Sequence, residues 1–104
     1  MPHAELLQEI KTRLAGVYGD RLRGVVLYGS QTRGDATSDS DVDVIVLLDG
    51  PARSWEDVKQ CSDALYSLML EIGRTIDAMP VDIRRYEAGE APLYIRAQQE
   101  GLAG

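Results

Sequence analysis

Two aspartates at the start of an apolar run are the residues whose type and spacing point most directly to chemistry. Asp41 and Asp43 stand two positions apart in the segment DVDVIVLL. Side chains two apart on a strand point to the same side, about 6–7 Å from each other. Unpaired charge at the mouth of a buried strand is costly, and Mg²⁺ is often bound by one or two carboxylates together with substrate phosphates. The pair therefore indicates a magnesium site, the alternative being a solvated acidic entry to a strand.

A glycine-serine pair directly after the preceding apolar run GVVLY indicates a place for an anion. Gly29 allows close approach of the backbone to a ligand, and successive N–H groups in such a turn can hold an anion. The Ser30 hydroxyl adds a donor, and the guanidinium of Arg33 suits phosphate. A plain turn is the alternative. Because no lysine follows Gly34, the segment is not a phosphate loop of the GKS/GKT type.

A third carboxylate, Asp82, lies within the segment 80–86, for which alternation predicts a strand. Strand interiors are depleted in aspartate. If this strand lies beside residues 41–47, three carboxylates come together, and such a set can hold two Mg²⁺ ions for phosphoryl or nucleotidyl transfer. The alternative is an edge-strand acid paired with Arg84.

The elements that must position these side chains follow from the hydrophobic spacing. A helix is predicted over 4–18, strands over 24–28 and 41–48, a loop between them, a helix from an N-cap at Ser54 to about Gly73, a strand over 80–86 and a closing helix over 90–100. This order predicts one α/β layer structure with helices on a small sheet. Residues 1–104 fit one domain.

The charge and cysteine content restrict the function classes. Seventeen acidic and eleven basic residues give a formal charge of −6, which argues against direct binding to a nucleic-acid backbone and suits a basic protein partner. No long apolar run is present, so we expect neither a signal peptide nor a membrane span. The single cysteine, Cys61, falls on an apolar helix face, where a buried thiol is expected rather than a nucleophile. A cytoplasmic location is expected.

Residues 29–43, GSQTRGDATSDSDVD, resemble the signature of the DNA-polymerase-β-type nucleotidyltransferase superfamily. A glycine-serine pair, ten further residues and then Asp-Val-Asp make up that signature. The minimal nucleotidyltransferases are the most similar branch, because Arg33-Gly34 and Ser40-Asp41 also match its wording. The resemblance implies a polymerase-β-like fold of the α/β (α+β) kind, with a small mixed β-sheet flanked by helices.

The resemblance also implies roles for these residues. In this superfamily the glycine-serine pair holds the triphosphate, the two acids bind Mg²⁺, and a third acid on a later strand completes the site. These roles fall on Gly29-Ser30, on Asp41 and Asp43, and on Asp82 as metal ligand or acceptor-activating base. Arg33 would assist the phosphates. The implied reaction transfers AMP from ATP to an acceptor hydroxyl with two Mg²⁺ ions.

A partner is implied by the resemblance as well. Many members of this branch are encoded beside a small helical HEPN protein, in a type VII-like toxin–antitoxin pair whose nucleotidyltransferase adenylylates and silences the HEPN toxin. The chain would then form a hetero-oligomer or a homo-oligomer. Two alternatives stay open: a non-catalytic antitoxin that neutralises its partner by contact, and a nucleotidyltransferase acting on small molecules.

Overall fold

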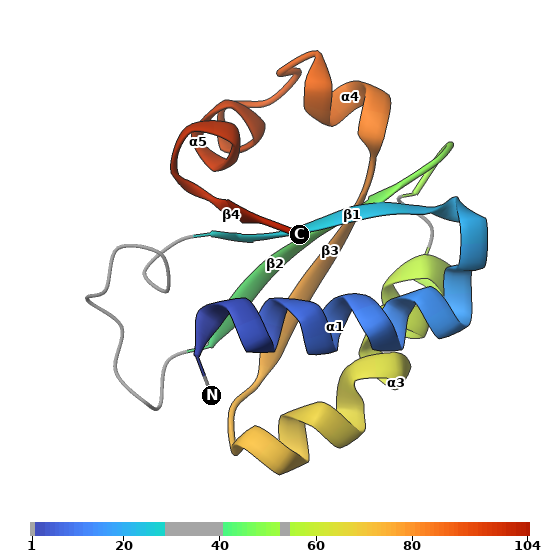
Figure 1. Cartoon of the computed structure of the whole chain (residues 1–104). Coiled ribbons are helices and arrows are strands. Elements are labelled where there is room, and N and C mark those ends of the chain that lie inside the picture. Colours follow the sequence, from blue (N-terminus) through green and yellow to red (C-terminus); the bar gives the residue numbers. More distant parts are fainter. Residues whose placement is uncertain (1, 29–40, 53–54) are drawn as a thin grey trace.

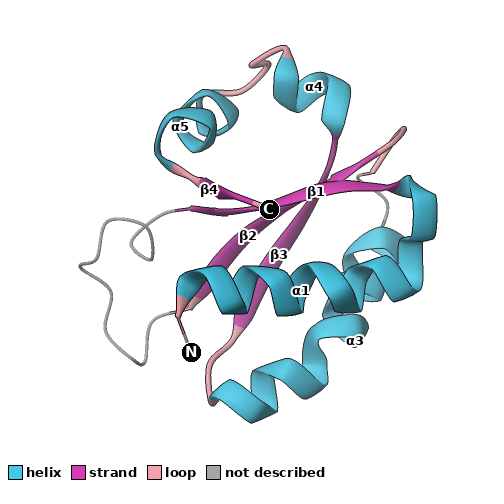
Figure 2. Cartoon of the chain, in the orientation of Figure 1, coloured by secondary structure: helices cyan, strands magenta, loops and turns pink. Residues whose placement is uncertain are grey.

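A four-stranded mixed sheet forms the centre of the chain, and helices cover both of its faces (Figures 1 and 2). The computed structural model describes residues 2–28, 41–52 and 55–104. The strand order is β3-β2-β1-β4. The strands are β1 Leu22–Tyr28, β2 Val42–Leu48, β3 Ile76–Asp82 and β4 Leu102–Ala103. β1 pairs antiparallel with β2 and β4, whereas β2 and β3 are parallel. The mixed sheet predicted from the sequence is thus confirmed.

In the part of the chain that the structure describes, helices pack on both faces of the sheet (Figure 1). The helices are α1 His3–Tyr18 and α3 Trp55–Ile72 on one face, and α4 Ile83–Glu87 and α5 Pro92–Glu100 on the other. A short 3₁₀ turn, η1 Gly19–Arg21, links α1 to β1. Helix α3 is the crossover that parallel strands require. None of the helices in the described ranges is long and apolar enough to span a membrane.

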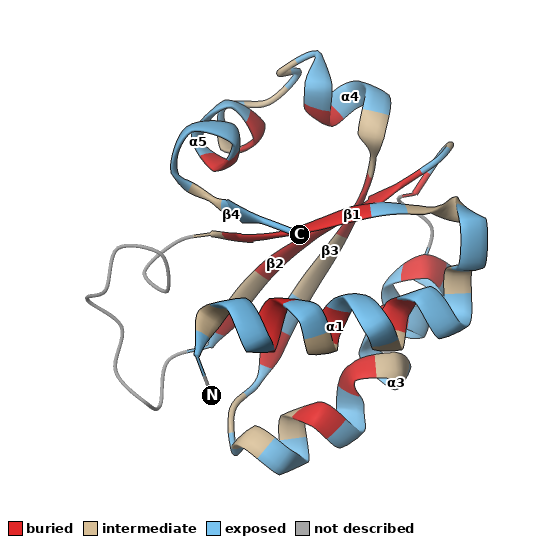
Figure 3. Cartoon of the chain, viewed as in Figure 1, coloured by how far each residue is buried: buried red, intermediate tan, exposed pale blue. Residues whose placement is uncertain are grey.

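The alternating side chains of β2 enter two different cores, and most of the strand is buried (Figure 3). Val42, Val44 and Val46 pack against α1 and α3, whereas Ile45 and Leu47 pack against α4 and α5. All five are buried. Successive side chains of a strand point to opposite faces, so the odd-numbered residues of β2 face α4 and α5. The apolar run predicted to be buried on both faces is buried in this way.

The third strand begins earlier than the sequence pattern predicts. A strand was expected over 80–86, but β3 spans Ile76–Asp82 and α4 takes the residues that follow. The strand ends where Asp82 caps α4, because its carboxylate accepts a hydrogen bond from the Arg84 backbone N–H at 3.1 Å. Gly73, with a φ of 67°, ends α3, which leaves the chain free to enter the sheet at Ile76.

Other predictions about the elements hold in part. The helices expected over 4–18 and 90–100 are present as α1 and α5, and Cys61 is buried on the inner face of α3. The side chains of Trp55 and Val58, in the first turn of the same helix, are exposed. The two-residue strand β4 was not predicted. The expected N-cap, Ser54, lies outside the described residues.

Candidate active site

Three aspartates lie at one end of the sheet, where β2 and β3 begin. Asp43 on β2 stands directly opposite Asp77 on β3, and Asp41 immediately precedes β2. On the other side of Asp43, the opposed residue is Tyr28, the last residue of β1. Neighbouring strands are about 4.8 Å apart, so Tyr28, Asp43 and Asp77 form a row across three strands. We call Asp41, Asp43 and Asp77 the acidic end of the sheet.

The side chains of this row share one face of the sheet. Tyr28, Asp43 and Asp77 each stand two positions along their strands from a side chain of the core beneath α4 and α5. Residues two apart on a strand point to the same face. The Asp43 side chain is half-buried, whereas Asp41 and Asp77 are exposed. A ligand from solvent can therefore reach both carboxylates next to Asp43.

The electrostatics of the acidic end favour a bound cation. Burial raises the pKa of Asp43, and the negative charges of Asp77 and Asp41 raise it further. Burial also raises the pKa of Tyr28, again with contributions from Asp43 and Asp77. Both shifts show that negative charge at this end is costly. A positive ion between the carboxylates would remove that cost.

The donor set fits magnesium better than a metal enclosed by protein ligands alone. In the part of the chain that the structure describes, no three Asp, Glu, His or Cys side chains are gathered tightly enough to form a metal site by themselves. Mg²⁺ typically takes one or two carboxylates, together with waters and substrate phosphates. Asp43 and Asp77, on adjacent strands, fit that description, and Asp41 adds a third oxygen donor nearby.

Asp82 does not join the acidic end, contrary to the expectation from the sequence. It stands opposite Leu48, five positions along β2 from Asp43, which corresponds to roughly 17 Å at 3.3 Å per residue. Its carboxylate is occupied by Arg84, whose Nη1 lies 3.5 Å from Oδ1. Arg84 also forms an ion pair of 2.8 Å with Asp49. The alternative reading, an acid paired with Arg84, describes the observed arrangement.

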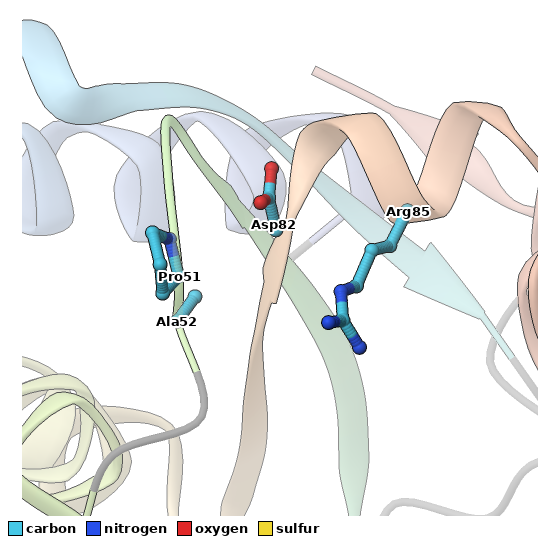
Figure 4. A pocket seen from close by; sticks show the side chains of 4 residues that line it. All are labelled: Pro51, Ala52, Asp82 and Arg85. Carbon is cyan, nitrogen blue, oxygen red and sulfur yellow. The ribbon is translucent and has the colours of Figure 1, made fainter.

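A small cavity lies at this other end of the sheet (Figure 4). Pro51, Ala52, Asp82 and Arg85 line it. Its lining among the described residues includes the carboxylate of Asp82 and the guanidinium of Arg85, whereas the acidic end holds three carboxylates. The cavity is thus separated from the acidic end by the length of β2 and differs from it in chemistry.

The three residues expected to bind phosphate, Gly29, Ser30 and Arg33, lie outside the described residues. The residues that flank this segment on either side are described. Tyr28 precedes it and stands opposite Asp43, and Asp41 follows it at the start of β2. The glycine-serine pair therefore follows directly on a residue of the candidate site.

Asp77 is the candidate residue that the sequence pattern missed. The signal was present in the alternation Ile76-Asp77-Ala78, in which Ile76 and Ala78 face the core of α1 and α3. Pro80 obscured it, because a proline is usually read as the start of a strand. An edge strand tolerates proline within its length, and β3 is the edge of the sheet.

The comparison with known families now identifies the class of protein. The chain belongs to the nucleotidyltransferase domain family, which matches residues 4–102. This family is the class of enzyme that the signature in residues 29–43 resembles.

Two proteins of Methanocaldococcus jannaschii are similar in sequence, and each carries the name putative protein adenylyltransferase. One is 41% identical over 44 residues, which cover 42% of this chain and 44% of the relative. The chain thus spans less than half the length of that relative. The other is 29% identical over 79 residues, covering 76% of this chain and 73% of the relative.

Two solved structures share the fold. A crystal structure of a toxin-antitoxin with AMP-PNP superposes with a TM-score of 0.63 at 18% identity, covering 93% of this chain and 72% of that one. A putative nucleotidyltransferase from Sulfolobus solfataricus gives a TM-score of 0.53 at 20% identity, covering 96% and 79%. Both support the nucleotidyltransferase fold of the chain.

Proposed function

We propose that the chain is a magnesium-dependent protein adenylyltransferase that transfers AMP from ATP to a hydroxyl of a HEPN-type toxin and thereby acts as its antitoxin. The observation that carries this proposal is the pairing of Asp43 with Asp77 across two parallel strands, next to Asp41. Membership of the nucleotidyltransferase family supports the reaction class. The names of the two relatives support a protein acceptor.

The proposed roles of the carboxylates follow from their positions. Asp43 and Asp77 would hold Mg²⁺ from adjacent strands, and Asp41 would contribute a third oxygen at the start of β2. Asp77 thus takes the role that the sequence pattern had given to Asp82. Two such ions, when bound, would neutralise charge on the phosphates and on the attacking and leaving oxygens.

The remaining roles concern the substrate. The N–H groups at Gly29-Ser30 and the guanidinium of Arg33 hold the β- and γ-phosphates. The acceptor oxygen then attacks the α-phosphorus, the bond from that phosphorus to the bridging oxygen breaks, and pyrophosphate leaves. The hydroxyl proton passes to a carboxylate of the acidic end. Asp77 is suited to receive it because its side chain is exposed beside Asp43.

The partner is proposed from charge and from a structural neighbour. The chain carries a formal charge of −6, which favours association with a basic protein. The neighbour with a TM-score of 0.63 was solved as a toxin-antitoxin with AMP-PNP, an assembly that combines a protein partner and an ATP analogue. A buried free thiol and ATP as substrate both fit a cytoplasmic setting.

The test is the intact mass of the HEPN-type protein after incubation with a substoichiometric amount of the chain, ATP and Mg²⁺. We expect a gain of one AMP per toxin molecule and a toxin that stays inactive in RNA cleavage after the chain is removed. The double variant Asp43→Asn/Asp77→Asn should transfer nothing. If the toxin recovers full RNA cleavage, or if this variant neutralises it equally well, the chain neutralises the toxin by contact and not by transfer of AMP.

A further inference from the structure

Tyr28 stands between a packed core and the acidic end of the sheet. Its side chain is half-buried and packs against the core beneath α4 and α5. Across the sheet it is opposed by Asp43 on β2, and Asp77 lies beyond Asp43 on β3. Tyr28 is therefore the aromatic member of a row whose other two members are carboxylates.

The end of β1 that carries Tyr28 is held on both sides. Tyr28 pairs with Asp43 in the register of β1 and β2, while Leu27 pairs with Leu102 of β4. Gly101, just before β4, lies so close to β1 that a Cβ there would stand 3.0 Å from the carbonyl oxygen of Leu27. Together with its packing on the core, this support limits the positions that the Tyr28 side chain can take.

The two described neighbours of Asp43 across the sheet differ in exposure. Asp77 is exposed, whereas Tyr28 is half-buried, as is Asp43 between them. Opposed side chains of an antiparallel pair have Cβ atoms about 4.5–5.5 Å apart, which brings the ring of Tyr28 within reach of the Asp43 carboxylate. Burial raises the pKa of both groups, and no hydrogen bond between the two contributes in the described part of the chain. Tyr28 thus presents its ring, and not its hydroxyl, to Asp43.

Charge repulsion gives this ring a possible effect on Asp43. The carboxylates of Asp77 and Asp41 repel that of Asp43, and a side chain can relieve such repulsion by turning to another staggered rotamer. Turning away from Asp77 moves the carboxylate towards β1, where Tyr28 stands. An apolar surface makes that rotamer costly, because the charge would lose water without gaining a partner. The carboxylates of Asp43 and Asp77 are therefore kept together, as a shared cation requires.

We infer that Tyr28 is a positioning residue of the metal site, whose aromatic ring holds the Asp43 carboxylate on the side of Asp77 and so strengthens the binding of Mg²⁺. This role rests on the proposed function, to which it adds a residue that touches neither the metal nor the substrate. A ligand already held in its bound arrangement loses less freedom when the cation binds. Residues that orient metal ligands typically contribute about 10- to 100-fold to the affinity for the metal.

The test compares Tyr28→Ala with Tyr28→Phe, which keeps the ring, and with Ile83→Ala as the matched control. Ile83 is also half-buried against the core beneath α4 and α5, but it follows Asp82 at the other end of the strands. Mn²⁺ serves as the probe, because carboxylates and water suit it as they suit Mg²⁺. Its binding is measured without nucleotide, from the electron paramagnetic resonance of free Mn²⁺, so that residues that hold phosphates do not contribute.

We expect Tyr28→Ala to bind Mn²⁺ about tenfold more weakly than the wild type, and Tyr28→Phe and Ile83→Ala to bind it within about twofold. In transfer assays Tyr28→Ala should need about tenfold more Mg²⁺ for half-maximal rate, whereas its kcat at saturating Mg²⁺ should stay within about twofold. Tyr28→Thr, whose β-branched side chain suits a strand, should behave as Tyr28→Ala does and replaces it if the alanine variant does not fold.

Other results would contradict this role. If Tyr28→Ala binds Mn²⁺ as the wild type does while Asp43→Asn loses binding, the metal site stands and the ring does not position it. An equal loss in Ile83→Ala reduces the effect to core packing, and an equal loss in Tyr28→Phe assigns it to the hydroxyl. If Asp43→Asn keeps the wild-type affinity, Asp43 holds no metal, and this role and the proposed function both fail. If the variants bind Mn²⁺ as expected but the wild type transfers no AMP, the positioning role stands and the proposed reaction fails.

Discussion

Asp43 and Asp77 occupy directly opposed positions on the parallel strands β2 and β3, although 33 residues separate them in the sequence. The crossover helix α3 sets this register, because it returns the chain to the same end of the sheet at which β2 begins. The relationship makes Asp77, rather than Asp82, the third carboxylate of the proposed site.

Asp77→Asn should abolish most transfer, whereas Asp82→Asn should leave it nearly intact. Losing a metal-ligating charge removes several kcal/mol of transition-state stabilisation, and each 1.36 kcal/mol is tenfold in rate, so we expect a loss of about 10²-fold or more. Asp82 caps α4 and contacts Arg84 instead. The measurement is kcat/KM for AMP transfer with ATP and Mg²⁺. Equal losses in the two variants would contradict the assignment.

The metal-free chain should lose stability as the pH rises, and Asp43→Asn should lose less. Because folding raises the pKa of Asp43, the folded state binds this proton more tightly than the unfolded state. That contribution is complete below the unfolded pKa of about 3.9 and disappears as the pH rises through the higher folded pKa. Thermal unfolding in EDTA should therefore give a higher Tm for the variant at pH 7.5, with a much smaller difference at pH 3.5.

The control for the pH experiment is Asp63→Asn, an exposed position on α3. Its Tm should follow that of the wild type at both pH values. Adding Mg²⁺ and ATP should raise the Tm of the wild type but not that of Asp43→Asn. If the wild type and Asp43→Asn unfold at the same temperature at both pH values, charge repulsion at Asp43 does not affect the stability of the fold.

Asp57→Ala should destabilise the fold by about 2 kcal/mol, the scale of a hydrogen bond to a charged group. Asp57 is the one charged side chain among the described residues that is buried, at 6% exposure, and Arg21 Nη1 lies 3.0 Å from its Oδ1. Removing the carboxylate leaves the guanidinium without this partner between η1 and α3. Urea unfolding measures the change, with Asp63→Ala on the same helix expected to stay within about 0.5 kcal/mol of the wild type. A loss of less than about 0.5 kcal/mol for Asp57→Ala would show that the Arg21–Asp57 ion pair does not stabilise the fold.

Cys61 should react slowly with iodoacetamide in the native chain and quickly in denaturant. Its side chain is fully buried, and burial raises the pKa of the thiol. Since the thiolate is the nucleophile, both effects lower the rate. At pH 8 we expect alkylation, followed by intact mass, to be at least tenfold slower than that of glutathione. Rapid native alkylation would show that the core around α3 opens.

The fold, and two carboxylates of the candidate site, could be predicted from the sequence because their signals are local. The apolar run after Asp43 indicated a strand buried on both faces, and Leu6, Ile10 and Leu14 at helical spacing indicated α1. The third carboxylate depended instead on the register between β2 and β3, which no local pattern determines. Asp82 was the more prominent candidate because it stands between apolar residues. Its carboxylate instead caps α4 by accepting a hydrogen bond from the Arg84 N–H, at the end of the sheet opposite Asp43.

The exposed apolar side chains of α3 show a similar limit to what the sequence alone can predict. Trp55 is a large apolar residue of this helix, yet it is 76% exposed. A helix that packs on one face needs only part of its apolar residues for folding. Sequence periodicity cannot tell which apolar residues belong to the core and which are available to another protein.

The parallel pairing of β2 and β3 also places two groups of charged side chains at opposite ends of these strands. All three proposed metal ligands lie where these strands begin, while Asp49, Asp82 and Arg84 form an ion-paired group where they end. The proposed chemistry therefore lies at the first end, and the second end is held by contacts among its own charged side chains. Substitutions of the exposed side chains at the second end should leave the turnover of each folded molecule nearly unchanged, so that end is the place to attach a fluorophore or a tether.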